Sequence, residues 1–165
     1  MFRLFAAVMA LCAFTAPTMA QQQLQNVQKS TSGDWTLECG ALPSGKRICQ
    51  MTQVVNNPKD GKPLLQAAVI KPSGGKKAIL RLVAPLGVWL RPGVGFSING
   101  GSKNNLNFEF CLREGCIAQL GLSSGLVNAM KRGSKARLSI QNIQRRKLNL
   151  DVSLRGFTAA YDGMR

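Results

Sequence analysis

Apolar and polar residues alternate along much of this sequence, and glycine or proline interrupts the alternation every few residues. The pattern is clearest over residues 136–140 and 148–154, where an apolar residue occupies every second position. A period of two residues places the apolar side chains on one face of a strand and the polar ones on the other. We therefore predict a hairpin from these two segments, with one face in the core and one in solvent.

Six further segments have the apolar content of strands. They are residues 35–39, 48–55, 64–70, 78–83, 107–111 and 116–122. Only residues 123–132 have a helical pattern, with a serine N-cap, an apolar face and a glycine after the last turn. Many short strands, one short helix and no strand–helix–strand spacing predict an all-β fold, an antiparallel β-sandwich or a jelly roll. We expect Trp35 and Trp89 in its core, the alternative being an aromatic platform for a glycan.

The first twenty residues have the features of a secretory signal peptide. Arg3 precedes the apolar run 4–14, and small residues before position 21 supply a cleavage site after Ala20. The run is too short to span a bilayer, which needs roughly 20 apolar residues, and we expect no transmembrane segment after cleavage. We expect a mobile, glutamine-rich segment over residues 21–32 and a single β-rich domain over residues 33–165.

Charge and a missing residue type limit the chemistry of the chain. The sequence has 22 Lys and Arg against 7 Asp and Glu, and it has no His. Because histidine is the usual general base and the commonest zinc ligand, its absence disfavours most hydrolase and metalloenzyme mechanisms. The two serines at 123 and 124 have no base beside them, so a helix cap explains them better than a nucleophile. We expect a protein that is not an enzyme and that uses no cofactor or metal.

Cysteines indicate an oxidising compartment. Cys12 would be removed with the signal peptide, which leaves an even number, namely Cys39, Cys49, Cys111 and Cys116. Four cysteines allow three pairings. Turn-like sequences between the members of each close pair favour Cys39 with Cys49 and Cys111 with Cys116, each bond closing a hairpin. Neither spacing is C-x-x-C, so a metal site or a redox pair is disfavoured.

Two clusters of basic residues are the remaining functional signal. They are Lys131, Arg132, Lys135 and Arg137, followed by Arg145, Arg146 and Lys147. If the fold brings the clusters together, they form an anion-binding surface. Outside the cytosol the partners would be anionic envelope or host-surface molecules, or an acidic protein, and we expect no specific nucleic acid. The alternative is that the charge serves solubility and that Lys131 and Arg132 complement a helix C-terminus.

Several short motifs, taken in order, resemble the invasion-associated locus B family of exported alphaproteobacterial proteins. They are Trp35 with Cys39, the segments 48–51 and 85–88, Leu90 and Gly93, the turn 98–100, and the segments 111–116 and 153–160. The resemblance covers roughly residues 33–161. It implies a periplasmic or secreted β-rich protein, and some members of the family are linked to entry into host cells. The family brings no catalytic residues to carry over.

Two functions are consistent with these features. The first is a non-enzymatic envelope or secreted protein of this family, which contributes to cell-surface or host-cell association through a basic surface. The second is a periplasmic inhibitor-like or chaperone-like factor that binds another protein. We expect the protein in the periplasm or the medium, with association with the outer membrane as a further option.

Overall fold

The computed structural model of the protein describes residues 25–72 and 77–164. The expected signal peptide, residues 1–20, lies outside this range. The described elements are β1 (Gln25–Ser32), β2 (Trp35–Ala41), β3 (Arg47–Asn56), β4 (Pro63–Pro72), β5 (Ile79–Ala84), β6 (Val94–Ile98), β7 (Asn104–Leu106), β8 (Phe108–Leu112), β9 (Gly115–Gly121), α1 (Ser124–Arg132), β10 (Lys135–Gln141), β11 (Lys147–Ser153) and α2 (Phe157–Asp162).

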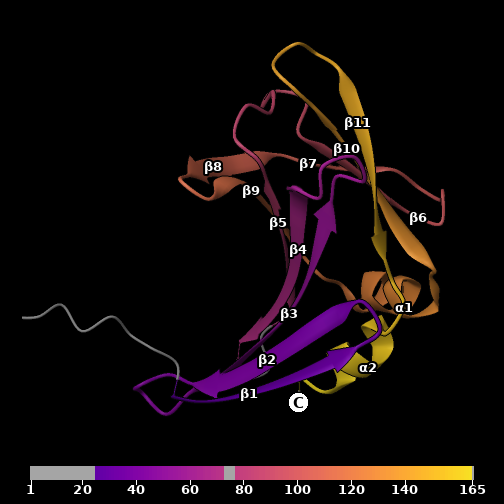
Figure 1. The fold of residues 1–165 in the computed structure, drawn as a ribbon. Coiled ribbons are helices and arrows are strands. Elements are labelled where there is room, and N and C mark those ends of the chain that lie inside the picture. The colour runs from indigo at the N-terminus through magenta and orange to yellow at the C-terminus, as the bar shows by residue number, and fades with distance from the viewer. Residues whose placement is uncertain (1–24, 73–76, 165) are drawn as a thin grey trace, which may run out of the picture.

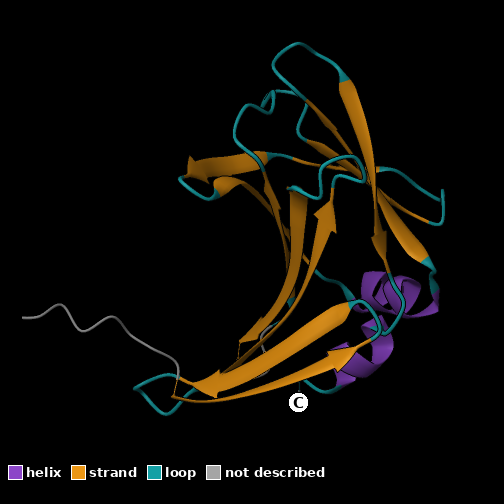
Figure 2. Cartoon of the chain, in the orientation of Figure 1, coloured by secondary structure: helices purple, strands orange, loops and turns teal. Residues whose placement is uncertain are grey.

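The strands form two antiparallel sheets. The large sheet has seven strands in the order β1-β2-β3-β4-β5-β9-β8, and the small sheet has four in the order β11-β10-β6-β7. Figure 1 shows the large sheet as a curved wall from β1 to β8, with β10 and β11 facing it. Figure 2 shows that both helices lie together at one end of the molecule, beside β1 and β2. The predicted antiparallel sandwich with α1 is therefore confirmed, and α2 is an additional short helix.

One hydrophobic core fills the space between the sheets. Burial alternates along β5 and β10, as the sequence pattern predicts, and Leu80, Leu82, Leu138 and Ile140 are almost fully buried. Burying a side chain of this size stabilises the fold by about 1.5–3 kcal/mol. Trp35 is completely buried and packs edge-on against Phe157 of α2, at 5.4 Å between ring centroids. The expectation for Trp35 is therefore correct.

Two elements differ from the sequence prediction. We expected a mobile segment over residues 21–32, but Gln25–Ser32 is strand β1, which pairs with β2 at the edge of the large sheet. Its one large apolar residue, Val27, is 51% exposed, so the strand is held by backbone hydrogen bonds and has no hydrophobic pattern. Helix α2 has only six residues, which is too short for a periodic signal, although it buries Phe157 and Ala160.

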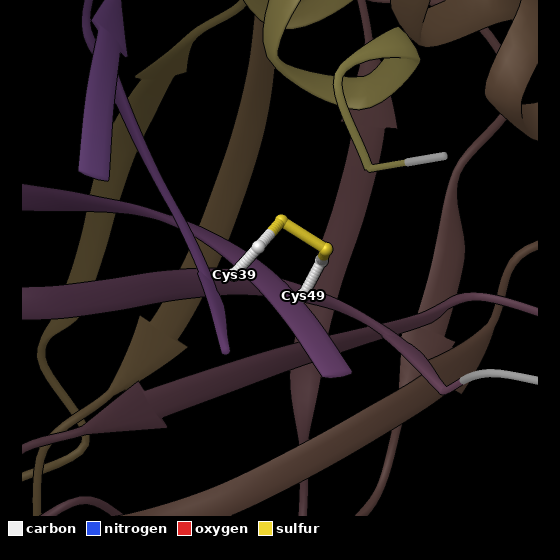
Figure 3. Close-up of a disulfide and its surroundings, with 2 residues drawn as sticks. All are labelled: Cys39 and Cys49. Carbon is white, nitrogen blue, oxygen red and sulfur yellow. A yellow bond between two sulfur atoms is a disulfide. The ribbon is translucent and has the colours of Figure 1, made fainter. Parts of the chain in front are cut away.

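Each cysteine pair joins two neighbouring strands. Cys39 and Cys49 lie opposite each other on β2 and β3 and form a disulfide, which Figure 3 shows in its surroundings. Cys111 and Cys116 lie opposite each other on β8 and β9 and form the second disulfide. The structure thus contains both of the favoured pairings, each within a hairpin. The first bond is buried, whereas Cys111 of the second is exposed.

The turn between β1 and β2 is locked against the end of β11. We call this contact between residues 32–35 and 153–157 the junction. The Trp35 indole N–H donates to the Ser153 carbonyl at 2.9 Å, and the buried Gln53 side chain both donates to that carbonyl and accepts from the Ser153 N–H. The Arg155 Nε lies 3.2 Å from an Asp34 carboxylate oxygen. These contacts join the two sheets at one end of the core.

Candidate anion-binding surface

The outer face of the small sheet carries basic side chains because of the strand period. On β10, Ala136, Leu138 and Ile140 point into the core, so Lys135 and Arg137 point outward. Antiparallel pairing of β10 with β11 places Arg137 opposite Asp151 and Gln141 opposite Lys147. Pairing of β10 with β6 places Arg137 opposite Ser97 and Ser139 opposite Gly95. Polar and basic groups from three strands therefore share this face.

These groups surround a hollow of about 260 Å³, which we call the basic hollow. Its polar lining consists of Ser97, Lys103, Arg137, Ser139, Lys147 and Asn149. Glycine at position 95 leaves room for the Ser139 side chain in this lining, because a Cβ atom there would lie only 2.4 Å from the Ser139 hydroxyl. Three cations with hydroxyl and amide donors around an open space suit the oxygens of a phosphate, sulfate or carboxylate group.

One carboxylate, Asp151, lies beside the basic hollow. Its oxygens accept hydrogen bonds from Arg137 Nε at 2.8 Å and from Lys135 Nζ at 3.0 Å. The hydrogen bond from Arg137, followed by that from Lys135, lowers the pKa of Asp151 to about 2. The same contact raises the pKa of Arg137. Two cations thus share one negative charge, and the group keeps a net positive charge at neutral pH.

Lys103 and Lys147 supply the charge that the local carboxylate does not neutralise. Within the residues that the structure describes, neither ammonium group has a carboxylate at ion-pair distance. Both residues are exposed, so their hydration is lost only in part when an anion binds. The sequence prediction missed Lys103, because it stands alone among glycine, serine and asparagine residues. Only the pairing of β7 with β6 brings it to this face.

The structure divides the predicted basic residues among several places. Lys135 and Lys147 lie at opposite ends of the β10–β11 hairpin, about 20 Å apart for a strand of this length. Lys131 donates to Asp162 at 2.6 Å and lies over the Tyr161 ring, so it connects α1 to α2. Arg132 lines a separate hollow beside α1. The two sequence clusters therefore do not merge into one surface, and Arg137 and Lys147 are the members that share the basic hollow.

Arg145 and Arg146 lie at the far end of the same hairpin. The turn 142–146 is held by a hydrogen bond from the Arg145 N–H to the Asn142 carbonyl at 2.8 Å and by one from the Arg146 N–H to the Asn142 side chain at 2.8 Å. The Arg145 guanidinium lies over the Trp89 ring, 4.9 Å from its centroid. Trp89 is consequently half-buried, at the surface and outside the core, which corrects the sequence expectation for this residue.

The described residues contain no group of three or more His, Cys, Asp or Glu side chains that could hold a metal ion. They also contain no helix that is long and apolar enough to cross a membrane.

Comparison with known proteins identifies the family. A model of the invasion associated locus B (IalB) protein family matches residues 35–165. Two invasion protein B homologs from Brucella abortus, of strain 2308 and of biovar 1 strain 9-941, are each 28% identical over 159 residues, which cover 96% of this chain and 89% of each relative. The crystal structure of invasion associated protein B from Bartonella henselae has a similar fold, with a TM-score of 0.72 and 22% identity over 83% of this chain and 95% of that chain. The chain therefore belongs to the invasion associated locus B family.

Proposed function

We propose that this protein is an exported, non-enzymatic envelope or secreted protein that attaches to anionic groups on a cell surface through the basic hollow. The observation that carries the proposal is the grouping of Lys103, Arg137 and Lys147 around one hollow that has a single carboxylate at its edge. Family membership supports a role in invasion-associated surface contact. The periplasm, the medium or the outer-membrane surface is its proposed location.

The composition of the basic hollow favours specific binding of an oxygen-rich anion. A general attraction to negative charge would not need the hydroxyl and amide groups in its lining. Hydroxyl and amide groups from Ser97, Ser139 and Asn149 stand between the cations, where they can donate to oxygens that a cation alone would not orient. A phosphorylated or acidic sugar of the envelope or host surface carries such groups. Because the cations are exposed, salt screens their attraction for an anion over a Debye length of about 8 Å at physiological ionic strength. The affinity should therefore fall as the salt concentration rises.

The test is binding to lipopolysaccharide and to heparin by a variant in which Lys103→Glu and Lys147→Glu are combined. Reversing two charges beside the bound anion should lower the affinity at least about tenfold. The matched control combines Lys46→Glu and Lys77→Glu, which change the net charge equally at two exposed positions near the ends of other strands. Equal losses in both variants would show that the overall charge, and not the basic hollow, causes the attraction.

A second candidate function is that of an inhibitor-like or chaperone-like periplasmic factor. One observation favours it, a mostly apolar hollow of about 490 Å³ near the end of β5, lined by Val54, Leu64 and Leu86 among others. Binding of one protein partner there should give a stoichiometric complex that Val54→Asp abolishes and Val27→Asp, at an exposed position on edge strand β1, does not. A complex that resists Val54→Asp would remove the support for this function.

A further inference from the structure

Two segments distant in sequence form one projecting unit at the end of the molecule opposite the helices. They are the loop 85–93, after β5, and the turn 142–146, between β10 and β11, and we call them together the two-loop tip. The Trp89 N–H donates to the Gln141 carbonyl at 2.7 Å, and the Ile143 N–H donates to the Gly87 carbonyl at 3.0 Å. In Figure 1 the β10–β11 turn is the topmost part of the chain. The backbone hydrogen bonds give this projection a defined shape.

Large apolar side chains of the two-loop tip are exposed to solvent. Leu86 is 61% exposed, Leu90 is 47% exposed and Ile143 is 67% exposed. Single exposed apolar residues are common on soluble proteins, but three on one projecting unit mark a contact surface. Trp89 lies among them, half-buried, with an apolar ring and one polar N–H group. Leu86 also lines the apolar hollow near the end of β5, but neither the core nor the basic hollow accounts for the exposure of Leu90, Ile143 and Trp89.

The charged side chains of the two loops themselves are all cations, and one carboxylate from outside the loops, that of Glu114, lies in the same hollow as Leu86. Arg91, Arg145 and Arg146 are exposed on the two loops, and Lys147 follows directly at the start of β11. The sequence has no Asp or Glu over residues 85–108 or 141–150. Within the described residues, the Arg145 guanidinium lies over the Trp89 ring and has no carboxylate at ion-pair distance. The two-loop tip therefore combines apolar side chains with cations that have no carboxylate at ion-pair distance within residues 25–72 and 77–164.

We propose that the two-loop tip inserts into the headgroup region of an anionic lipid bilayer. Leu86, Leu90 and Ile143 would enter the boundary between headgroups and acyl chains, and Trp89 would lie at the interface, where amphipathic aromatic rings are stabilised. The arginines would contact lipid phosphates. This inference goes beyond the proposed function, because it names a second surface and assigns a lipid bilayer to it as partner.

The combination of groups distinguishes a lipid surface from other anionic partners. A soluble polyanion would contact the cations but would leave the three apolar side chains in water. A bilayer of phosphatidylglycerol can contact the cations and bury the apolar side chains at the same time, because its phosphate groups lie directly above the apolar phase. The long Arg side chains can extend to the phosphates while the shorter apolar ones point deeper. The convex shape of a loop and a turn also suits a shallow insertion without rearrangement of the sheets.

The experiment measures binding of the purified protein to vesicles of phosphatidylcholine with and without phosphatidylglycerol. The variant combines Leu90→Ser with Ile143→Ser, which removes apolar surface and leaves the charge unchanged. We expect its affinity for phosphatidylglycerol vesicles to fall at least about tenfold, while its affinity for heparin stays within about twofold. The control combines Val27→Ser with Phe110→Ser, which removes exposed apolar side chains from β1 and β8 and should leave both affinities unchanged.

Tryptophan fluorescence provides a readout that does not depend on the stability of a variant. Addition of phosphatidylglycerol vesicles should shift the emission of the wild-type protein toward shorter wavelength, because Trp89 leaves water while Trp35 is already buried. Trp89→Phe should remove the shift.

Four outcomes would contradict the proposals. Undiminished vesicle binding by the Leu90→Ser, Ile143→Ser protein, or an unchanged emission spectrum of the wild-type protein in the presence of bound vesicles, would overturn the insertion. Wild-type protein that binds heparin but not phosphatidylglycerol vesicles would overturn the insertion and leave the proposed function standing. Wild-type protein that binds lipopolysaccharide, heparin and vesicles equally poorly would overturn both.

Discussion

The junction and the two-loop tip are built from the same residue types and use them in opposite ways. Each joins two distant chain segments through backbone hydrogen bonds, and each contains a tryptophan, an arginine and a glycine with positive φ. At the junction, Trp35 is fully buried and Arg155 is paired with Asp34. At the two-loop tip, Trp89 is half-buried and Arg145 has no carboxylate partner among the described residues.

This difference separates groups that stabilise the fold from groups that are available to a partner. A fully buried aromatic ring has already removed its apolar surface from water on folding. A half-exposed ring still has apolar surface in water, and a partner can bury that surface on binding. The charge of an arginine paired with a carboxylate, as Arg155 is with Asp34, is partly neutralised, whereas an unpaired arginine offers its full charge to a partner. Substitutions at the junction should therefore change stability, and matched substitutions at the two-loop tip should change binding.

The largest expected contrast is between two glycines with nearly equal, positive φ angles. Gly156 has φ +84°, and a Cβ atom there would lie 2.0 Å from the Ser32 carbonyl oxygen. Gly87 has φ +88°, and a Cβ atom there would have no neighbour within 4 Å. Gly156→Ala should lower the free energy of unfolding by about 3 kcal/mol or more, because backbone segments of both sheets must separate. Gly87→Ala should cost only the left-handed backbone strain, about 1–2 kcal/mol.

Urea denaturation of the two variants measures this contrast directly. Similar losses of stability in both would mean that the positive φ alone sets the cost and that the close approach at the junction is unimportant.

The tryptophans give the second contrast. Trp35→Phe removes the indole N–H that donates to Ser153 and leaves a cavity in the core, so we expect a loss of about 2 kcal/mol in the free energy of unfolding. Trp89→Phe should change stability by less than about 0.5 kcal/mol, because the ring lies at the surface. Thermal denaturation compares the two proteins. A larger loss for Trp89→Phe would assign the two-loop tip a structural role.

Period-two patterns allowed much of the sandwich to be predicted from the sequence. The alternation over residues 136–140 correctly placed Ala136, Leu138 and Ile140 in the core, and the serine before α1 does cap that helix. Strand β1 escaped prediction because an edge strand held by backbone hydrogen bonds needs no apolar pattern. The junction escaped because Gln53, a polar residue that the sequence gives no reason to bury, meets Ser153, which is 100 positions away.

The candidate site was only partly predictable for a related reason. Sequence clustering suggested that neighbouring basic residues act together, but strand geometry separates Lys135 from Lys147 by the length of β10. It also brings Lys103, isolated in the sequence, to the same hollow as Arg137. Whether a cation is already paired depends on contacts such as that of Lys131 with Asp162, which no local pattern indicates.

The two arginines offer a smaller contrast. Arg145 has φ +61°, a left-handed conformation that is strained for a residue with a side chain. Arg145→Gly should relieve this strain, and since glycine also gains entropy in the unfolded chain, the net change in stability should lie within about 0.5 kcal/mol. Vesicle binding should nevertheless weaken, because a cation is lost from the two-loop tip. A marked loss of stability measured by thermal denaturation would show that the contact of Arg145 with Trp89 supports the fold.

The smallest expected effect concerns acid. The hydrogen bond from Arg155, followed by that from Ser153, lowers the pKa of Asp34 below its ordinary value of 3.8. A carboxylate whose pKa is lower in the folded state stabilises the fold above its unfolded pKa, and this contribution is lost as the pH falls through the folded pKa. The melting temperature should therefore fall as the pH drops below about 4. Asp34→Asn should make that decline shallower, although exposure of the pair keeps the effect small.

The two-loop tip supplies the control for this titration. It contains no carboxylate, so Arg145→Gln should shift the curve of melting temperature against pH without changing its slope between about pH 4 and pH 2. Asp151, whose pKa is about 2, loses its charge at the acid end of the same range and contributes to the slope in both proteins. Two results would contradict this comparison. Parallel curves for the wild type and Asp34→Asn would mean that the ion pair at the junction does not stabilise the fold. A changed slope for Arg145→Gln would mean that Arg145 at the two-loop tip contributes to stability and is not simply available to a partner.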